Sequence, residues 1–264
     1  MCQPIVLLTQ QQNMSIGQDG FRIEVRGGRV LNEGKCPAIG KECNDLVRII
    51  VVILDLEGFT NFFDSASVNK NIVVASYVNS FLCWVNYRLD REVNKGRLPE
   101  RPRLSKFLGD GLLYIWEVEK QRLTSRRILD LINFFYNLTR GKDCYEEEFL
   151  PKFMNKLGQN WSCDYPKHLR ASISLGHAVK YVQRGRSMDY VSECINIASR
   201  LLKINPEVYF MAHADVYIGP EMLNQGYVKK KIPNIRGIGK PIVVYIDKED
   251  FTALSDKSMF QYMR

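Results

Sequence analysis

Residues 46–60 read LVRIIVVILDLEGFT, and this stretch decides the fold. Residues 47–54 form an apolar run rich in β-branched side chains, which predicts a central strand covered on both faces. Asp55 ends that strand, where a carboxylate needs a partner or a bound cation to offset the cost of burial. A helix is expected from about Thr60, so free backbone N–H groups would face whatever occupies the intervening turn.

The segments that follow alternate between extended and helical patterns, and residues 141–164 predict a surface excursion that contains a helix. Gly109-Asp110-Gly111 predicts a tight turn between two strands, and a second hairpin is expected around Gly176. The pattern predicts an α/β (α+β) fold with a central mixed sheet flanked by helices. Strands are expected over residues 103–108, 112–116, 169–175, 178–182, 208–212, 226–232 and 242–246, and helices over 60–93 (interrupted near Ser67), 125–139 and 189–202.

The first 45 residues differ in character from the rest. Phe21, Ile23 and Val25 alternate with charged residues and are followed by two glycines, a pattern typical of a β-hairpin. We therefore expect an N-terminal β-arm over residues 1–45, one α/β domain over residues 46–250 and a C-terminal tail over residues 251–264.

Composition excludes several classes of protein. The chain has 264 residues, of which 45% are hydrophobic, enough for a full core rather than a disordered chain. No apolar run approaches the ~20 residues that cross a bilayer, and the N-terminal MCQPIVLLTQQQ lacks the basic region and cleavage pattern of a signal peptide. The seven cysteines form no CxxC pair and no zinc spacing, so free thiols are expected. These features predict a cytoplasmic protein without membrane contact.

The net charge of +8 calls for an anionic partner, and both nucleic acid and a nucleoside triphosphate would satisfy it. The densest basic run, Lys229-Lys230-Lys231, is more typical of a solvated strand edge than of a binding site. A nucleic-acid-binding domain would show clustered basic residues with exposed aromatics in a recognisable motif, and none is apparent. We therefore expect no nucleic-acid partner.

Asp55 and Asp110 are the first pair of candidate functional residues. If the hairpin around Asp110 lies beside the central strand, its turn falls at the same sheet edge as Asp55. Two carboxylates brought together there repel, and a pair of divalent cations relieves that repulsion. The alternative is structural: a turn aspartate, and a strand-end aspartate that caps the next helix.

The second constellation is Asp189, Asn196 and Arg200 in the run MDYVSECINIASRLL. Asn196 and Arg200 are four residues apart and so share one helical face. Asp189 precedes Asn196 by seven residues, about two helical turns. It would lie on nearly the same face of the helix if the helix already begins at Asp189. A polar stripe in an otherwise apolar helix needs a partner, and an ordinary surface pair between Arg200 and Glu193 is the alternative.

Four blocks of sequence together resemble the class III adenylyl and guanylyl cyclases. VVILDLEGFT is similar to the first metal motif of that family, KFLGDG to the second, DYVSECINIASRL to the catalytic helix and IRGIGKPIVVY to the phosphate-contacting strand motif. The blocks occur in the family's order and cover roughly residues 46–247. The resemblance implies the class III cyclase catalytic domain for residues 46–250, and a reaction that closes a nucleoside triphosphate into a 3′,5′-cyclic monophosphate.

The resemblance also implies roles for individual residues. Asp55 and Asp110, with the Leu56 backbone carbonyl, would hold two divalent cations, Mn²⁺ or Mg²⁺. Asn196 would position the ribose, and Arg200 would neutralise charge that develops on the α-phosphate.

Further positions would contact the substrate. Arg236 stands where the family places a triphosphate-binding Lys, a change that conserves charge but not geometry. Lys106 and Asp189 stand at the two base-selecting positions, and Phe59 completes the implied substrate-binding set. The family also forms head-to-tail homodimers with composite sites, and this chain carries both halves of a site.

The base is not decided by these residues. One donor and one acceptor, Lys106 and Asp189, suit adenine, cytosine or uracil. The bare catalytic domain resembles the stand-alone pyrimidine cyclases of Pycsar anti-phage defence, which favours UTP or CTP, with ATP as the alternative. A catalytically inactive, cyclase-like nucleotide-binding domain is the alternative from another class. It would be expected to lack one of the metal or transition-state residues, all of which are present.

Overall fold

The computed structural model describes residues 45–65, 70–157, 164–183, 187–216 and 226–262, which belong to one compact unit. The N-terminal β-arm predicted over residues 1–45 lies outside these residues, apart from Asp45. Among the helices in the described ranges, none is long and apolar enough to cross a membrane.

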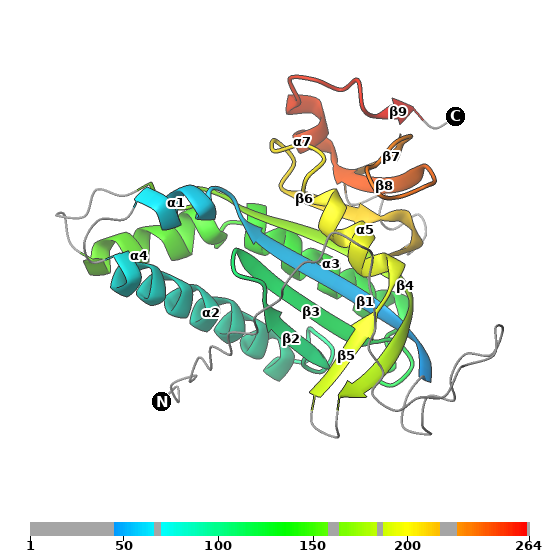
Figure 1. The fold of residues 1–264 in the computed structure, drawn as a ribbon, viewed down its shortest axis with the longest axis horizontal. Coiled ribbons are helices and arrows are strands. Elements are labelled where there is room, and N and C mark those ends of the chain that lie inside the picture. Colours follow the sequence, from blue (N-terminus) through cyan, green and yellow to red (C-terminus); the bar gives the residue numbers. More distant parts are fainter. Residues whose placement is uncertain (1–44, 66–69, 158–163, 184–186, 217–225, 263–264) are drawn as a thin grey trace, which may run out of the picture. The chain divides into compact units, whose positions relative to one another are not determined.

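One mixed sheet runs through the described residues in the order β2-β3-β1-β4-β6-β8-β7-β9, with β5 paired to β4 (Figure 1). β1 (Asp45–Leu56) lies between β3 (Gly111–Glu117) and β4 (Leu169–Gln183) and is antiparallel to both. The pairing of β4 with β6 (Phe210–His213) is parallel, which makes the sheet mixed and confirms the predicted fold class. The other strands are β2 (Leu104–Phe107), β5 (Ser187–Val191), β7 (Tyr227–Ile232), β8 (Ile242–Asp247) and β9 (Gln261–Tyr262).

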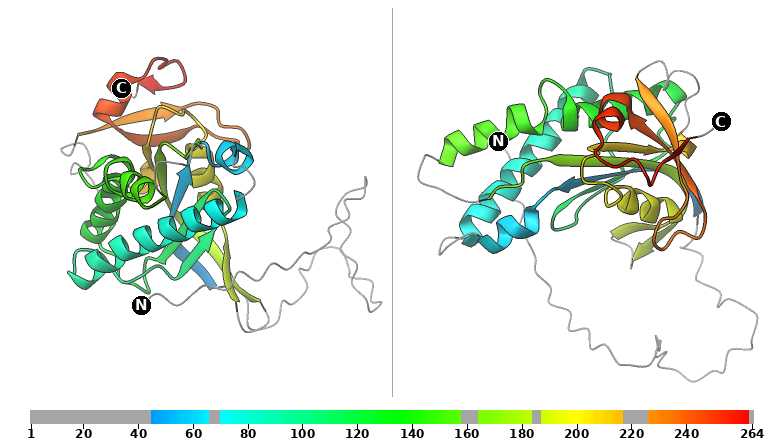
Figure 2. Two further views of the ribbon diagram at one scale, coloured as in Figure 1. Left: turned by 90° about the vertical axis from the view of Figure 1, so that its left-hand side faces the viewer. Right: turned by 90° about the horizontal axis from the view of Figure 1, so that it is seen from above.

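Helices cover both faces of the central strands. Figure 2 shows α2 (Lys70–Asn94) and α3 (Ser125–Arg140) on one face and α5 (Glu193–Leu201) on the other. The remaining helices are α1 (Phe59–Ser65), the π-helix η1 (Tyr145–Phe149), α4 (Leu150–Leu157), the 3₁₀-helix η2 (Ala214–Val216) and α7 (Lys248–Ala253).

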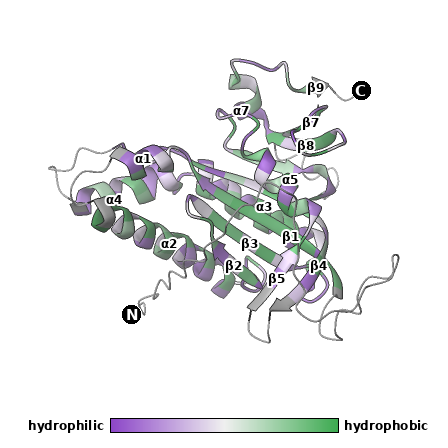
Figure 3. Ribbon diagram, in the orientation of Figure 1, coloured by the Kyte–Doolittle hydropathy of each residue, from purple (hydrophilic) through white to green (hydrophobic). Residues whose placement is uncertain are grey.

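The alternation of side chains along β1 explains why the strand is apolar throughout. Ile50, Val52 and Leu54 pack in the same cluster as residues of α2 and α3, whereas Ile49, Val51 and Ile53 pack with residues of α5. These six side chains are at most 5% exposed. Full burial of one such side chain contributes about 1.5–3 kcal/mol, so β1 contributes strongly to stability. Figure 3 shows its hydrophobic character and that of β3.

The predicted hairpin over residues 169–175 and 178–182 is wrong, because β4 is one continuous strand of 15 residues. Gly176 makes no turn: a Cβ built there would lie 3.0 Å from the Cβ of Cys194. The glycine is needed because α5 crosses closely over the strand, a reason that a turn pattern does not reveal.

The helix predicted over residues 189–202 begins only at Glu193. Asp189 instead lies in β5, which pairs with the end of β4. Ser192 ends the strand and caps the helix, since its Oγ accepts a hydrogen bond from the Cys194 N–H at 3.1 Å. Asp189 therefore does not share a helical face with Asn196.

Two further expectations need correction. Residues 141–157, the described part of the segment 141–164 apart from Asp164, contain helix as predicted. They are not a surface excursion, because Tyr145, Phe149 and Phe153 are buried in an aromatic cluster against α2. Lys230 is also buried, with its Nζ 4.2 Å from the centre of the Phe251 ring. Its strand β7 has neighbours on both sides, so it is not a sheet edge.

The last described residues pack onto the sheet. β9 pairs with β7, and Phe251, Leu254 and Phe260 are buried in a cluster with residues of β7 and β8. The predicted domain boundaries themselves stay a prediction.

Candidate active site

Asp55 and Asp110 lie at the same edge of the sheet. Asp55 pairs in register with Gly111 across β1 and β3, and the Leu56 N–H donates to the Asp110 carbonyl at 2.9 Å. The side chain of Asp55 is largely buried, whereas Asp110 is exposed at the tip of its turn. The backbones of Asp55 and Asp110 are therefore neighbours at this edge, and their action as a pair stays a prediction.

Both glycines of the turn are required by its shape. Gly109 has a φ of +99°, a conformation that L side chains rarely adopt. At Gly111 a Cβ would lie 1.9 Å from the Leu54 carbonyl oxygen, so only glycine lets β3 approach β1 this closely. The turn closes with a hydrogen bond from the Leu108 N–H to the Gly111 carbonyl at 2.9 Å.

Arg170 is a site residue that sequence reasoning missed. It faces Asp55 in register across β1 and β4, and its Nε and Nη2 lie 3.2 and 2.5 Å from Asp55 Oδ2. Both side chains are less than a fifth exposed. The sequence shows only that Arg170 lies between the apolar residues Leu169 and Ala171. This pattern does not reveal which residue of β1 lies opposite Arg170.

The donor set at this edge fits a hard divalent cation. Asp55, Asp110 and the Leu56 carbonyl supply oxygen atoms, the ligands that Mg²⁺ and Mn²⁺ prefer. Among the described residues no group of three or more His, Cys, Asp or Glu side chains is placed to hold a metal by itself.

Lys106 and Asp189 are also brought together. Lys106 Nζ on β2 lies 3.5 Å from Asp189 Oδ2 on β5, and both side chains are partly exposed. The other oxygen of Asp189, Oδ1, accepts from the Tyr190 N–H at 2.9 Å. A cation and a carboxylate thus stand side by side in solvent, and each is available to a ligand.

A buried network fixes the strand that carries Asp189. Tyr190 donates its hydroxyl to Glu117 Oε1 at 2.6 Å, and Lys180 Nζ lies 2.9 Å from the same oxygen. Burial opposes ionisation of Glu117, but the hydrogen bonds from Tyr190 and Lys180 outweigh it and lower its pKa. Burial, reinforced by the Glu117 carboxylate, raises the pKa of Tyr190.

Asn196 and Arg200 lie exposed on one face of α5. A Cβ built on Gly237 would lie 3.7 Å from Arg200 Nη2, so the guanidinium packs against this glycine. Arg236 precedes it in an exposed turn, which Ile238 closes through a hydrogen bond to the Ile235 carbonyl at 2.9 Å.

The alternative partner of Arg200 is engaged elsewhere. Glu193 pairs with Lys240 at 3.1 Å and not with Arg200. In the described part of the chain, no hydrogen bond or ion pair links Asn196 or Arg200 with Asp55 or Asp110.

Phe59 lies at the start of α1, with its side chain 9% exposed and its ring 5.9 Å from that of Phe62. The ring belongs to the core, so a contact with a substrate would come from the backbone of Phe59.

Comparison with solved structures shows what this arrangement resembles. The adenylyl cyclase CyaB from P. aeruginosa superposes with a TM-score of 0.54 at 14% sequence identity, over 77% of this chain and 94% of that chain. The guanylyl cyclase Cya2 superposes with a TM-score of 0.53 at 16% identity, over 77% of this chain and 93% of that chain. No protein-family model matches the chain, and no curated protein matches it by sequence. The described residues therefore have the fold of adenylyl and guanylyl cyclase catalytic domains.

Proposed function

We propose that this protein is a nucleotide cyclase that converts a nucleoside triphosphate into its 3′,5′-cyclic monophosphate and diphosphate. The observation that carries the proposal is the placement of Asp55 and Asp110 side by side at one sheet edge of a cyclase-type fold. In this reaction the ribose 3′-oxygen forms a bond to the α-phosphorus. The bond to the β-phosphate bridging oxygen breaks, and the 3′-hydroxyl loses its proton.

Asp55, Asp110 and the Leu56 carbonyl would hold two divalent cations, Mg²⁺ or Mn²⁺. When bound, such cations lower the pKa of the ribose hydroxyl and stabilise charge on the triphosphate. Arg170 fixes the Asp55 carboxylate at the strand end before any cation arrives. Asp110, in its exposed turn, would bind the cations from the side on which the triphosphate enters.

The residues of the second half would act on the substrate directly. Arg200 would neutralise the charge that develops on the α-phosphate in the transition state. Asn196, one helical turn away, would donate to or accept from the ribose and hold it for in-line attack. Arg236 would bind the terminal phosphates through its planar fork of donors.

Base selection would fall to Lys106 and Asp189. The Lys106 ammonium is a donor for uracil O4 or cytosine N3, and the Asp189 carboxylate is an acceptor for uracil N3–H or the cytosine amino group. The same pair also suits adenine, so the choice of UTP or CTP as the proposed substrate rests on the resemblance to the stand-alone pyrimidine cyclases, with ATP as the alternative. By analogy with the stand-alone cyclases of anti-phage defence, its cyclic product would serve as a second messenger.

A homodimer in which each site takes one half from each protomer follows from the resemblance, because this chain carries both halves and a two-fold axis would generate two complete sites. An exposed apolar row adds to this support. Leu46, Val179 and Val191 occupy one register position across β1, β4 and β5 and are 70%, 39% and 63% exposed. Partners in register point to the same face of a sheet, so these side chains form a continuous surface that a second copy would cover.

Incubation of the purified chain with each nucleoside triphosphate in Mg²⁺ or Mn²⁺, followed by mass spectrometry, tests the proposal. Cyclic UMP or cyclic CMP is the expected product, and Asp110→Asn is the matched inactive control. Exclusive formation of cyclic AMP would support the proposed cyclase activity but show that the substrate is ATP rather than a pyrimidine triphosphate. No cyclic product from any triphosphate, together with metal-dependent nucleotide binding, would identify an inactive binding domain instead.

A further inference from the structure

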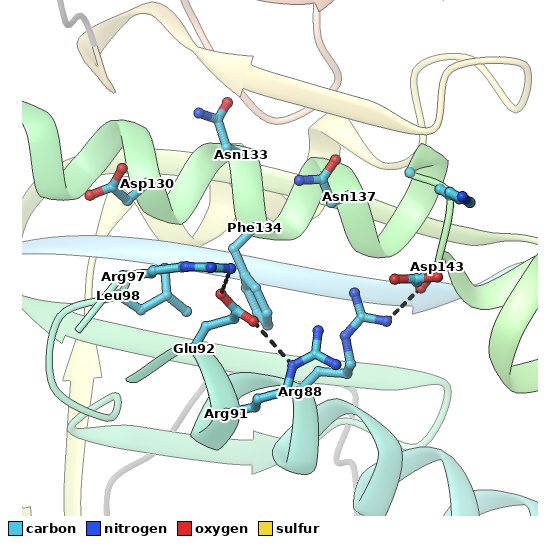
Figure 4. A pocket seen from close by; sticks show the side chains of 12 residues that line it. Arg88, Arg91, Glu92, Arg97, Leu98, Asp130, Asn133, Phe134, Asn137 and Asp143 are labelled. Carbon is cyan, nitrogen blue, oxygen red and sulfur yellow. Dashed lines mark hydrogen bonds and ion pairs between the residues drawn. The ribbon is translucent and has the colours of Figure 1, made fainter. Parts of the chain in front are cut away.

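A polar cavity lies on the helical side of the molecule, and none of the residues proposed for catalysis lines it. It has a volume of about 420 Å³ and is formed by the second half of α2, the loop that follows it, α3 and residues 141–143. Figure 4 shows Phe134 of α3 directed towards Glu92 and Arg88 of α2, with Asn133 and Asn137 also on α3. The two walls differ in chemistry: guanidinium groups of α2 and its loop face amide and aromatic groups of α3.

Positive charge is in surplus on the α2 side. Glu92, whose side chain is only 13% exposed, lies 3.1 Å from Arg91 Nε, 3.2 Å from Arg97 Nη1 and 3.8 Å from Lys95 Nζ. One carboxylate therefore serves three cations, which leaves two positive charges unbalanced. Arg91, Glu92 and Arg97 line the cavity itself.

The other charged groups of the wall do not cancel this surplus. Asp130 pairs with Arg126 at 3.4 Å. Lys142 and Asp143 are adjacent residues of opposite charge and together contribute nothing net. Arg88 is balanced by Glu148, with which it forms a short ion pair.

Arg88 supplies a second, independent observation. It lines the cavity and is 6% exposed, and its Nη1 donates to the Asp143 carbonyl at 2.7 Å. Its Nε is buried and has no hydrogen-bond partner. Buried donors are nearly always satisfied, and each exception calls for an explanation such as a ligand. A bound anion would satisfy this donor.

The α3 wall is suited to a flat, partly polar group. Asn133 and Asn137 are one helical turn apart, and each carries both a donor and an acceptor. Phe134, 7% exposed, points from α3 towards α2 between Glu92 and the arginines (Figure 4), and Leu98 is 4% exposed beside it. An aromatic ring would find an apolar surface here, with amides at its edge.

We propose that this cavity is an accessory binding site for a small phosphate monoester with a planar ring, the class to which nucleoside 5′-monophosphates belong. A phosphate monoester carries about −1.5 to −2 charges at neutral pH, which matches the surplus of two cations around Glu92. Arg91 and Arg97 would bind the phosphate through their planar donor forks. Arg88 Nε would gain its missing acceptor, and Phe134 with the two asparagines would hold the ring.

Isothermal titration of the full chain in EDTA with 5′-UMP, 5′-AMP, uridine and inorganic phosphate tests the proposal. An Arg200→Ala/Arg236→Ala background removes the anion-binding groups of the proposed catalytic site. The experiment thus separates this proposal from the proposed function. One monophosphate should bind per chain, at least about tenfold tighter than inorganic phosphate or uridine, a difference of about 1.4 kcal/mol. No detectable heat from either monophosphate, or equal binding of inorganic phosphate, would overturn the proposal.

Substitutions locate the binding. Arg97→Gln and Asn137→Leu should each weaken monophosphate binding at least about tenfold, because each removes a hydrogen-bonding group from the proposed contact. Lys203→Gln is the control, since Lys203 is an exposed cation that stands outside the cavity wall. Melting temperatures confirm that the variants are folded. Binding that survives both cavity substitutions would place the ligand elsewhere and refute the assignment.

Discussion

Asp55 and Arg170 face one another in antiparallel register on β1 and β4, and the Arg170 guanidinium donates to the Asp55 carboxylate through Nε at 3.2 Å. The carboxylate that ends the apolar central strand is therefore already paired. A divalent cation proposed at Asp55 would share this carboxylate with Arg170 rather than meet a bare, repelled charge. The pair consequently bears on both the stability of the metal-free protein and its affinity for metal.

Substitution of the two aspartates should separate these effects. Asp55→Ala and Asp110→Ala should both abolish cyclisation, because each removes a proposed metal ligand. From like-charge repulsion alone, neither would be expected to lower stability. The ion pair changes this expectation for Asp55, whose loss leaves Arg170 largely buried without its partner. Denaturant unfolding in EDTA should show a loss of about 1–3 kcal/mol for Asp55→Ala, between the values for exposed and buried pairs. Asp110→Ala should be nearly neutral, and near-normal turnover in either variant would refute the metal assignment.

Arg170→Met should raise the affinity for Mn²⁺ while lowering the stability of the metal-free protein. The reason is that Arg170 competes with the cation for Asp55 and at the same time neutralises it. Titration of free Mn²⁺ by electron paramagnetic resonance gives the affinity without reference to activity. The single variants Asp55→Asn and Arg170→Met and the double variant form a double-mutant cycle, which measures how much the pair contributes to the free energy of unfolding. Unchanged Mn²⁺ affinity together with additive stability effects would show that the pair does not act on the metal.

Two inactive variants should complement one another if the site is shared between protomers. Asp55→Ala and Arg200→Ala chains should each be inactive alone. Co-expressed, they would form heterodimers with one doubly damaged site and one intact site, so activity should return to at most about half per heterodimer. Verified heterodimers that stay inactive would place the whole site within one chain.

The network around Glu117 predicts acid sensitivity of the strand that carries Asp189. The pKa of Glu117 is lowered in the folded chain, so its contribution to stability is present above its unfolded pKa and is lost as pH falls through its folded pKa. Unfolding free energies measured from pH 7 downwards should show wild type more stable than Glu117→Gln, with the difference shrinking at acid pH. Glu119→Gln is the control, because Glu119 is exposed two residues away. A pH-independent difference would contradict this assignment.

Gly111→Ala should prevent the Asp110 turn from closing onto β1. Its Cβ would meet the Leu54 carbonyl oxygen at 1.9 Å, and backbone cannot move aside as a flexible side chain does. Stability should fall by at least about 1–3 kcal/mol, as for overpacked sites, and activity should be lost with it. Gly239→Ala is the matched control, since nothing lies within 4 Å of the Cβ it would add. A fully stable Gly111→Ala variant would show that the turn is placed incorrectly.

Local pattern was sufficient to predict the parts of the fold that depend on local sequence. The β-branched run of β1 and the Gly-Asp-Gly turn were both recognisable because their residue types determine their shape directly. Gly176 led to the wrong prediction of a turn, because the glycine is needed instead for close packing of Cys194, which comes from α5, far along the chain. The start of α5 was missed because pairing with β4 holds Asp189 extended. Arg170 was missed for the same reason: only the register between β1 and β4 places it beside Asp55.

The continuity of β4 has a consequence for how such an enzyme could diverge. Arg170, near one end of this strand, faces Asp55, and Tyr181, near the other end, faces Asp189. Because side chains alternate along a strand, gain or loss of one residue between them would turn one of the two to the opposite face. Insertion or deletion of a single residue between Arg170 and Tyr181 would therefore disturb one of these two pairings. An altered choice of base would instead come from exchanges at the proposed base-selecting positions, Lys106 on β2 and Asp189 on β5, with β4 unchanged.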